Sequence, residues 1–364
     1  MPIIEIPIEE EPDLTILNKT DNLLKTEGLV DIQVNGFGGV DFNTPGISCD
    51  SLRHSLEKML ASGVTTCLPT IITSTESHLL SCLSDLETAR NSSTLAKTMI
   101  AGYHLEGPFL SALPGFSGCH PINEMGVVNP EMFLRLQDVA GGNIRLVTLA
   151  PEVDGALAFI KNLVRDGIIV ALGHTAAGLD KIREAVEAGA SLSTHLGNGT
   201  SSELQKNDNP IMAQLGEDQL SASFIADGYH LSPEVLKVYL RAKCSERVVL
   251  ITDATAAASA VPGLYRLGNL ELLLGSDPVI FDHKTSRPVG SAVTLDQCVR
   301  NVMQWYNISL KEAVSWAGDN PLKIIGSSKA NTLLANSKRN VWWKEDKDGW
   351  KVKAAQSGRF LYTA

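Results

Sequence analysis

Short apolar runs alternate with helical segments along most of this chain of 364 residues. The runs are rich in β-branched side chains and are apolar on both faces, which is typical of parallel strands covered by helices. Eight runs follow one another, at residues 29–34, 63–70, 99–105, 144–151, 168–174, 190–196, 220–228 and 247–254. Eight strand–helix units predict an α/β protein with a (β/α)8 TIM barrel. A doubly wound sheet is the alternative, but the even spacing favours closure.

The two ends of the chain do not follow this alternation. Residues 1–27 are polar, contain prolines and include short strand-like pieces. Residues 331–364 contain NVWWKEDKDGWKVKAA, a hairpin-like pattern around Asp348 and Gly349. We therefore expect a small β annex made from residues 1–27 and 331–364, beside a barrel of residues 28–330.

Charge and composition exclude several classes of protein. A net charge of −10, a pI near 5.3 and no basic run argue against a nucleic-acid partner. The acidic, proline-containing N-terminus does not have the pattern of a secretory signal, and no apolar run is long enough for a bilayer. Six scattered cysteines without a CxxC pair indicate reduced thiols. These features predict a cytoplasmic protein that does not bind membranes.

Polar residues with catalytic potential stand at the ends of several predicted strands, where TIM barrels carry their active sites. The third, fifth, sixth, seventh and eighth runs end in or near Glu106, His174, His195, Asp227 with His230, and Asp253.

One carboxylate and two imidazoles that meet at one rim suit a zinc site with an open position for water. A charge such as that of Glu106 at the end of an apolar strand is costly unless it is paired, so we expect a metal to neutralise it. Asp253 is then placed to take a proton from the water. A single buried histidine is more often a satisfied core residue, but repeated hits at strand ends favour a site.

Eight motifs of the chain resemble, in order and spacing, those of the N-acetylglucosamine-6-phosphate deacetylases of the amidohydrolase superfamily. They are DIQVNGFGGVDF, GVTTCLPTIITS, HLEGPFL, VTLAPE, GHT, THLGNG, IADGYH and ITDAT. The resemblance runs from about Leu29 to Gly326 and implies a zinc-dependent hydrolase on a (β/α)8 barrel, usually a homodimer, with a β-sandwich annex. Because the N-terminal arm of this chain is short, we expect that annex to be reduced.

The resemblance also implies roles for individual residues. Glu106, His174 and His195 would hold the metal. Asp253 would activate water as a general base and then protonate the leaving amine. His120 would help to polarise the amide carbonyl. Cys119, next to His120, could instead suggest a thiol nucleophile. This alternative is weak, because side chains of sequence neighbours on a loop rarely point at each other.

The positions expected to bind the sugar phosphate match the family in part. By the resemblance, Asn198, Gly199 and His230 would contact the sugar phosphate. Relatives usually place an arginine eight positions after this asparagine, and here that position is Lys206. Lysine binds phosphate as a point charge without a bidentate fork, so the preferred sugar is open. A solvated loop lysine is the alternative interpretation.

The first strand predicts the number of metals. Many members of the superfamily carry His-x-His there and bind two metals, whereas this chain has Gln33 and Asn35. Amides are poor zinc ligands beside imidazole, so we expect one divalent metal per chain, zinc. Hydrogen bonding at the strand end is the alternative role for the two amides.

These observations predict hydrolysis of N-acetylglucosamine 6-phosphate, a small sugar-phosphate substrate, to glucosamine 6-phosphate and acetate. One alternative is an amidohydrolase acting on another N-acylated amino sugar or small amide. Another is a non-catalytic sugar-phosphate binder, against which Asp253 argues, because binding alone needs no general base.

Overall fold

The computed structural model describes residues 3–6, 23–275, 279–282, 289–326, 338–347 and 349–364. Eight parallel strands form its central sheet, and each pairs with the next one along the chain. They are β3 (Leu29–Val34), β6 (Val64–Ile72), β7 (Tyr103–Glu106), β8 (Ile144–Leu149), β9 (Ile169–Leu172), β10 (Leu192–Ser193), β11 (Ser221–Ile225) and β12 (Val248–Ile251). The predicted (β/α)8 barrel is confirmed, and all the expected runs contribute a strand.

The barrel closes where the ends of β3 and β12 meet. Asp253 donates its backbone N–H to Gln33 O at 2.9 Å, and Asn35 donates its own to Ala254 O at 2.7 Å. Val34 and Ala254 form a parallel bridge. The carboxyl ends of the first and last strands are therefore fixed to each other.

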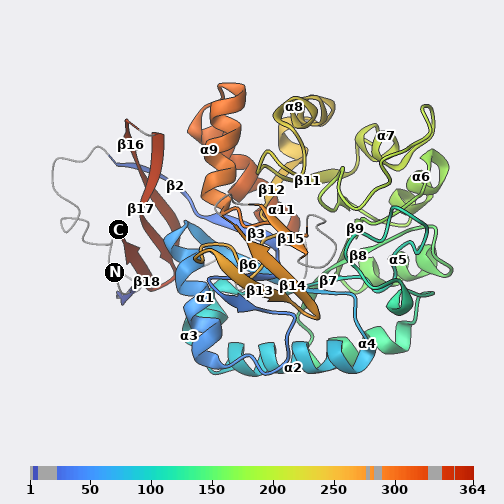
Figure 1. Ribbon diagram of the computed structural model, residues 1–364, viewed down its shortest axis with the longest axis horizontal. Coiled ribbons are helices and arrows are strands. Elements are labelled where there is room, and N and C mark those ends of the chain that lie inside the picture. The colour runs from blue at the N-terminus through green and yellow to red at the C-terminus, as the bar shows by residue number, and fades with distance from the viewer. Residues whose placement is uncertain (1–2, 7–22, 276–278, 283–288, 327–337, 348) are drawn as a thin grey trace.

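Helices cover the outside of the sheet (Figure 1). They are α1 (Cys49–Ala61), α2 (Glu76–Asn91), α3 (Thr94–Met99), α4 (Pro130–Val139), α5 (Ala156–Arg165), α6 (Leu179–Glu187), α7 (Pro210–Leu215), α8 (Pro233–Ala242), α9 (Leu295–Tyr306), α10 (Leu310–Val314) and α11 (Asn320–Gly326). Several begin at a side chain that accepts a free N–H of the first turn, as Ser48, Thr75 and Asn129 do. In the described part of the chain, no helix has the length and apolar character needed to cross a membrane.

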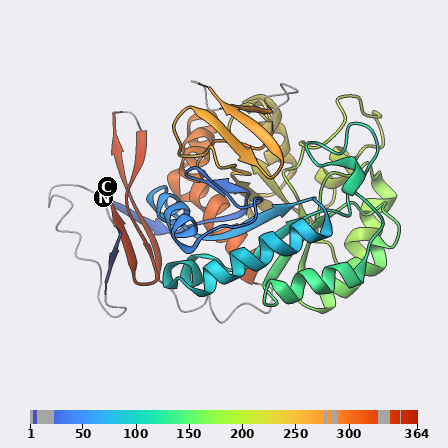
Figure 2. The same ribbon diagram turned by 60° about the horizontal axis from the view of Figure 1, so that its bottom comes forward.

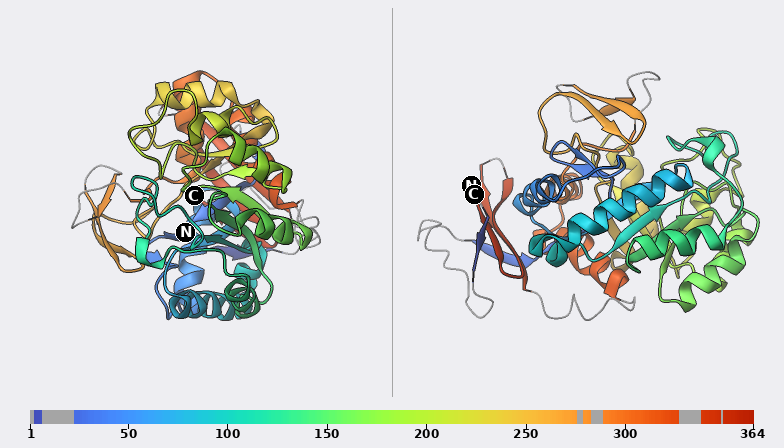
Figure 3. Two further views of the ribbon diagram at one scale, coloured as in Figure 1. Left: turned by 90° about the vertical axis from the view of Figure 1, so that its right-hand side faces the viewer. Right: turned by 90° about the horizontal axis from the view of Figure 1, so that it is seen from below.

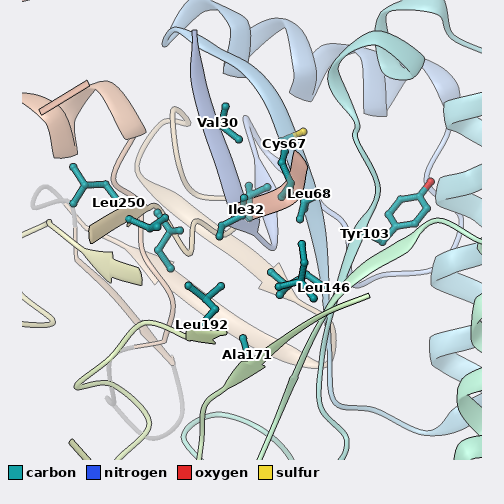
Figure 4. Close-up of a cluster of buried hydrophobic side chains, with 14 of the residues drawn as sticks. Val30, Ile32, Cys67, Leu68, Tyr103, Leu146, Ala171, Leu192 and Leu250 are labelled. Carbon is teal, nitrogen blue, oxygen red and sulfur yellow. The ribbon is translucent and has the colours of Figure 1, made fainter. Parts of the chain in front are cut away.

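Apolar side chains fill both faces of the strands, as the sequence predicts. Every residue of β3 and β6 is buried. Figure 4 shows side chains of neighbouring strands pointing into one cluster, among them Val30, Ile32, Leu68, Leu146 and Leu250. This packing makes the barrel a rigid base for the polar residues at its rim.

Both ends of the chain contribute to one antiparallel sheet, ordered β1-β18-β17-β16-β2 and visible at the left of Figure 1. Its strands are β1 (Ile4–Glu5), β2 (Leu24–Glu27), β16 (Arg339–Asp346), β17 (Gly349–Ser357) and β18 (Phe360–Thr363). The expected β annex from both termini is thus confirmed, as one layer among the described residues. The β16–β17 hairpin ends at the Asp346–Gly349 pair. Asp348 and residues 1–2, 7–22 and 331–337 of the predicted annex lie outside the described residues.

A three-stranded antiparallel sheet that the sequence analysis did not predict follows β12. It consists of β13 (Gly263–Leu267), β14 (Leu270–Leu274) and β15 (Ile280–Asp282). Figures 2 and 3 show it at one end of the barrel, next to the hairpin of β4 (Gly36–Phe37) and β5 (Val40–Asp41). The N–H of Gly268, in its first turn, donates to Asp41 Oδ2 at 2.8 Å. This contact fixes the small sheet over the rim.

Candidate metal centre and active site

A cavity of about 380 Å³ lies at the carboxyl ends of the barrel strands. Its lining includes Asn35, Glu106, His120, His174, His195 and Asp253. TIM-barrel enzymes place their chemistry at this end. Of the strand-end residues selected from the sequence, all but Asp227 line this one space: Glu106, His174, His195, His230 and Asp253.

Glu106, His174 and His195 form the centre of this cavity. Oε1 of Glu106 lies 2.9 Å from Nε2 of His195 and 3.4 Å from Nε2 of His174. All three residues are buried, and one ligand atom from each lies within 4.8 Å of the others. One carboxylate and two imidazoles at this separation can hold a divalent metal ion.

The hydrogen bonding of His174 supports a cation at this point. Its Nδ1 lies 2.9 Å from the backbone oxygen of Phe116, which can only accept a hydrogen bond, so Nδ1 carries the proton. When this is the only proton on the ring, the lone pair of Nε2 faces Oε1 of Glu106. Two electron pairs facing each other at 3.4 Å need a positive charge between them. A metal ion between His174 Nε2 and Glu106 Oε1 accepts an electron pair from each of them.

The pKa values of Glu106 and His195 are shifted by burial and by their contact with each other. Burial raises the pKa of Glu106, but the neighbouring imidazoles of His174 and His195 outweigh it and hold that pKa well below its ordinary value. Burial lowers the pKa of His195, whereas the hydrogen bond and charge of Glu106 raise it, and the net direction is upward. The Glu106 carboxylate is therefore ionised and available as a ligand.

Three residues of the site have left-handed backbones, with φ of 49° at His174, 31° at His195 and 49° at Asp253. Such a φ is uncommon outside glycine and costs about 1–3 kcal/mol at a residue that the fold holds in place. The chain turns sharply at the strand end and directs these side chains into the cavity. Backbone contacts hold the turns: Ser111 N donates to His174 O at 3.0 Å, and His195 N donates to Ser223 Oγ at 2.8 Å.

Asp253 faces the cavity from the last strand. Its Oδ1 accepts a hydrogen bond of 2.7 Å from Asn35 Nδ2. Burial raises the pKa of Asp253 to about 6, while the charge of His195 and the amide of Asn35 act in the opposite direction. A carboxylate with such a pKa can accept and return a proton near neutral pH. Gln33 is buried on β3, the first strand, and its Nε2 has no hydrogen-bond partner among the described residues.

His120 enters the cavity from the loop after β7. Its Nδ1 lies 2.8 Å from Thr73 Oγ1, and its Nε2 lies 4.0 Å from Glu106 Oε1. Burial, with the neighbouring His174, lowers the pKa of His120 to about 3, so the ring is neutral. The preceding residue of the loop is no nucleophile, because burial raises the pKa of the Cys119 thiol to about 12.

The residues expected to contact a sugar phosphate are only partly brought together. Asn198, Gly199 and His230 line the cavity. His230 Nδ1 is paired with Asp227 Oδ2 at 2.7 Å, so Asp227 orients the imidazole. Lys206 is exposed on its loop and is not part of the cavity lining. A contact between Lys206 and a phosphate stays a prediction.

Sequence reasoning missed several residues that line the cavity or hold a residue that does. Thr73, which holds His120, and Leu267 with Val289, which form an apolar wall, carried no catalytic signal. Tyr229 was passed over within the IADGYH motif. The small sheet that brings Leu267 could have been predicted from the Gly-Asn turn in YRLGNLEL, which has the form of a hairpin.

A model described as the amidohydrolase family matches residues 25–336. The chain belongs to this family. The amidohydrolase family is metal-dependent, and Glu106, His174 and His195 are a possible metal-binding group. The family resemblance found in the sequence is therefore confirmed.

Individual amidohydrolases resemble the chain over most of its length. An N-acetylglucosamine-6-phosphate deacetylase of Bacillus subtilis is 31% identical over 301 residues, which is 82% of this chain and 74% of the relative. An N-acetylgalactosamine-6-phosphate deacetylase of a Shewanella species is 31% identical over 353 residues, 93% of this chain and 83% of the relative. The structure of a Mycobacterium smegmatis N-acetyl-D-glucosamine-6-phosphate deacetylase variant in complex with N-acetyl-D-glucosamine-6-phosphate matches with a TM-score of 0.83 and 30% identity, covering 94% of this chain and 87% of that chain.

Gly118 offers a direct test of how His174 is held. A Cβ added to Gly118 would lie 2.8 Å from Cε1 and 3.2 Å from Nδ1 of His174, closer than real side chains allow. We expect Gly118→Ala to displace the imidazole and to lower metal affinity at least tenfold, as changes to outer-shell partners typically do. Isothermal titration with Zn²⁺ measures this effect.

Gly142→Ala is the matched control for backbone strain. Gly142 also has a positive φ, 73° against 56° at Gly118, but no atom lies within 4 Å of its added Cβ. Both variants lose stability through their left-handed alanine, about 1–2 kcal/mol. Equal zinc affinity in the two variants would show that the contact with His174 is unimportant.

Proposed function

We propose that this amidohydrolase removes the N-acetyl group of N-acetylglucosamine 6-phosphate, giving glucosamine 6-phosphate and acetate. The observation that carries the proposal is the convergence of Glu106, His174 and His195 with Asp253 in one cavity. The relatives that share this barrel act, by their names, on N-acetylated hexosamine 6-phosphates.

The cofactor proposed is one zinc ion per chain, held by Glu106, His174 and His195. When bound, it would supply the Lewis acidity that lowers the pKa of a water to about 7 and polarises a carbonyl group. The amides of Gln33 and Asn35 occupy the first-strand positions, and Asn35 is engaged with Asp253, which favours a single ion.

The proposed proton transfers use Asp253. Its carboxylate takes a proton from the attacking water and later delivers it to the amide nitrogen, so that the amine leaves as a neutral group. Such help is typically worth about 10²- to 10⁴-fold. The Asn35 hydrogen bond keeps the carboxylate turned into the cavity.

His120 is proposed to contact the carbonyl oxygen of the acetyl group. The role requires Thr73 Oγ1 to donate to Nδ1, so that the neutral imidazole carries its proton on Nε2 and can donate it to the substrate. A donor at the developing oxyanion contributes more to the transition state than to the ground state. Asn198, Gly199 and His230 would hold the sugar phosphate, with His230 oriented by Asp227.

The second candidate substrate is N-acetylgalactosamine 6-phosphate. The relative from Shewanella, which carries that name, covers more of this chain than the Bacillus relative does. The chain is further proposed to act as a homodimer in the cytoplasm. Free thiols at all six cysteines suit a reducing compartment.

A deacetylation panel tests the function. Acetate release is measured with zinc-loaded protein on N-acetylglucosamine, N-acetylgalactosamine and N-acetylmannosamine, each with and without a 6-phosphate. We expect turnover of the phosphorylated glucosamine derivative above the others. Equal rates on free sugars would remove the phosphate role of Lys206 and His230, and a zinc-loaded protein without turnover would favour a non-catalytic binder.

The pH dependence follows from Asp253. Its pKa is raised from 3.8 to about 6, and only the ionised form can accept a proton, so turnover falls as the pH drops through this pKa. A bound cation draws the midpoint below 6. Removing the amide in Asn35→Ala takes away a bond that favours the carboxylate, so the acid limb should move to higher pH. Plots of log(kcat/KM) against pH measure the shift, and an unmoved limb would contradict the assignment.

A further inference from the structure

A second buried aspartate lies in the barrel beneath Asp253 and has no part in the proposed proton transfers. Asp31 of β3 is completely buried. Its Oδ2 accepts a hydrogen bond of 2.6 Å from Thr252 Oγ1, and its Oδ1 accepts one of 3.3 Å from Thr252 N. Its Oδ1 also accepts the N–H of Gln33, on its own strand, at 3.3 Å, so the cost of burying the carboxylate is met by bonds within β3 and to the end of β12.

The partner of Asp31 directly precedes the proposed general base. Thr252 Oγ1 donates to Asp31 and accepts from Ala254 N at 3.1 Å. One hydroxyl therefore connects β3 to the residue that follows Asp253. From the other side, Ser291 Oγ donates to Thr252 O at 2.6 Å, and Ser291 N donates to Asp253 O at 3.0 Å. The turn is held by side chains as well as by the sheet.

The turn at Asp253 needs such support because its φ of 49° is left-handed. A non-glycine residue keeps this geometry only where its surroundings over-determine it. Without the Thr252 hydroxyl, the N–H of Ala254 loses an acceptor and the turn loses its side-chain bond to Asp31, while the backbone bond from Asp253 N to Gln33 O remains. The carboxylate of Asp253 would then relax away from the water it is proposed to deprotonate.

We propose that Asp31 and Thr252 form a positioning pair that holds Asp253 in its catalytic orientation. The inference rests on the proposed function, because it assigns the pair a role in the same proton transfer. Neither Asp31 nor Thr252 lines the cavity, so the effect of the pair should fall on kcat. A misplacement of about 1 Å by a mutation outside the reacting groups can cost about 10²-fold in rate.

The test compares Thr252→Val with Thr252→Ser. Valine keeps the shape and removes the hydroxyl, whereas serine keeps the hydroxyl. We expect Thr252→Val to lower kcat roughly 10- to 100-fold with KM and zinc content close to wild type, and Thr252→Ser to restore most of the rate. Adding Asp31→Asn to Thr252→Val should cost little more, because residues that act as one unit are not additive.

Thr66→Val is the matched control. Thr66 is buried in β6 of the same barrel, and its hydroxyl has no hydrogen-bond partner among the described residues. The same substitution there should leave kcat unchanged. A wild-type rate in Thr252→Val, an equal loss in Thr252→Ser, or a loss in Thr66→Val as large as in Thr252→Val would overturn the positioning role.

A crystal structure of Thr252→Val separates this inference from the proposed function. We expect Asp253 to leave its left-handed conformation, whatever substrate the enzyme uses. An Asp253 that superimposes on the wild type refutes the positioning pair. A wild-type protein that releases no acetate refutes the proposed deacetylation instead, and the displacement of Asp253 still decides the structural claim.

Discussion

Asp253→Asn should lower kcat by about 10²- to 10⁴-fold while the protein still binds zinc. Asparagine has the shape of aspartate, and its amide oxygen can still accept the hydrogen bond that Asn35 makes at 2.7 Å. What is lost is the ability to take a proton from water and return it to the leaving nitrogen. Because the two transfers use one carboxylate, the loss belongs at the upper end of this range.

Acetate release and metal analysis on the same preparation measure the two outcomes together. Asp296→Asn is the control, because Asp296 is a buried aspartate of α9 that pairs with Arg300 and does not line the cavity. It should retain the wild-type kcat. If Asp253→Asn kept more than a tenth of the wild-type rate, another group would have to be the base.

The positions of the barrel strands could be predicted from the sequence because burial on both faces leaves a plain signal. Runs such as residues 64–72 are buried at every residue, and few patterns other than a covered parallel strand have this form. Closure then adds information, since the carboxyl ends of all strands meet at one rim. For this reason the separation of Glu106, His174 and His195 along the chain did not hide their convergence.

The loops could not be predicted in the same way, because long-range contacts decide where they lie. The loop that carries His120 is held through Phe116 O, which contacts His174, and through Thr73 at the end of β6. Lys206 is a case that counting leaves open: it lies eight residues after Asn198, its side chain is exposed and outside the cavity lining, and its contact with a phosphate stays a prediction. Spacing within a loop does not fix a direction in space.

The small sheet of β13 to β15 was missed for a different reason. Its strands alternate exposed and buried residues, as in the exposed Leu273 between the buried Leu272 and Leu274. This pattern is typical of an antiparallel sheet with one covered face, and it stood inside a region assigned to the parallel barrel. Its buried face contributes Leu267 to the cavity, so an insertion with no catalytic motif shapes the site.

Removal of the metal should abolish acetate release, and adding Zn²⁺ back should restore it. Glu106, His174 and His195 meet within 4.8 Å in a buried cavity, and no lysine or arginine among the described residues lines it to replace the lost charge. The apo site then keeps a buried carboxylate whose only positive partners are imidazoles. Because the metal binds the folded state, its loss should also lower the melting temperature; binding at 1,000 times the Kd is worth about 4 kcal/mol.

His195→Gln separates metal binding from general damage by the chelator. Glutamine removes the imidazole and offers a poor zinc ligand, so zinc content and turnover should fall together, by more than the 10- to 100-fold typical of outer-shell changes. His54→Gln is the control, because His54 is exposed on α1 away from the cavity, and it should match the wild type in both measurements. Full turnover by a His195→Gln protein free of metal would show that these three residues do not act through a cation. The two imidazoles beside Glu106 would then serve only to neutralise a buried charge.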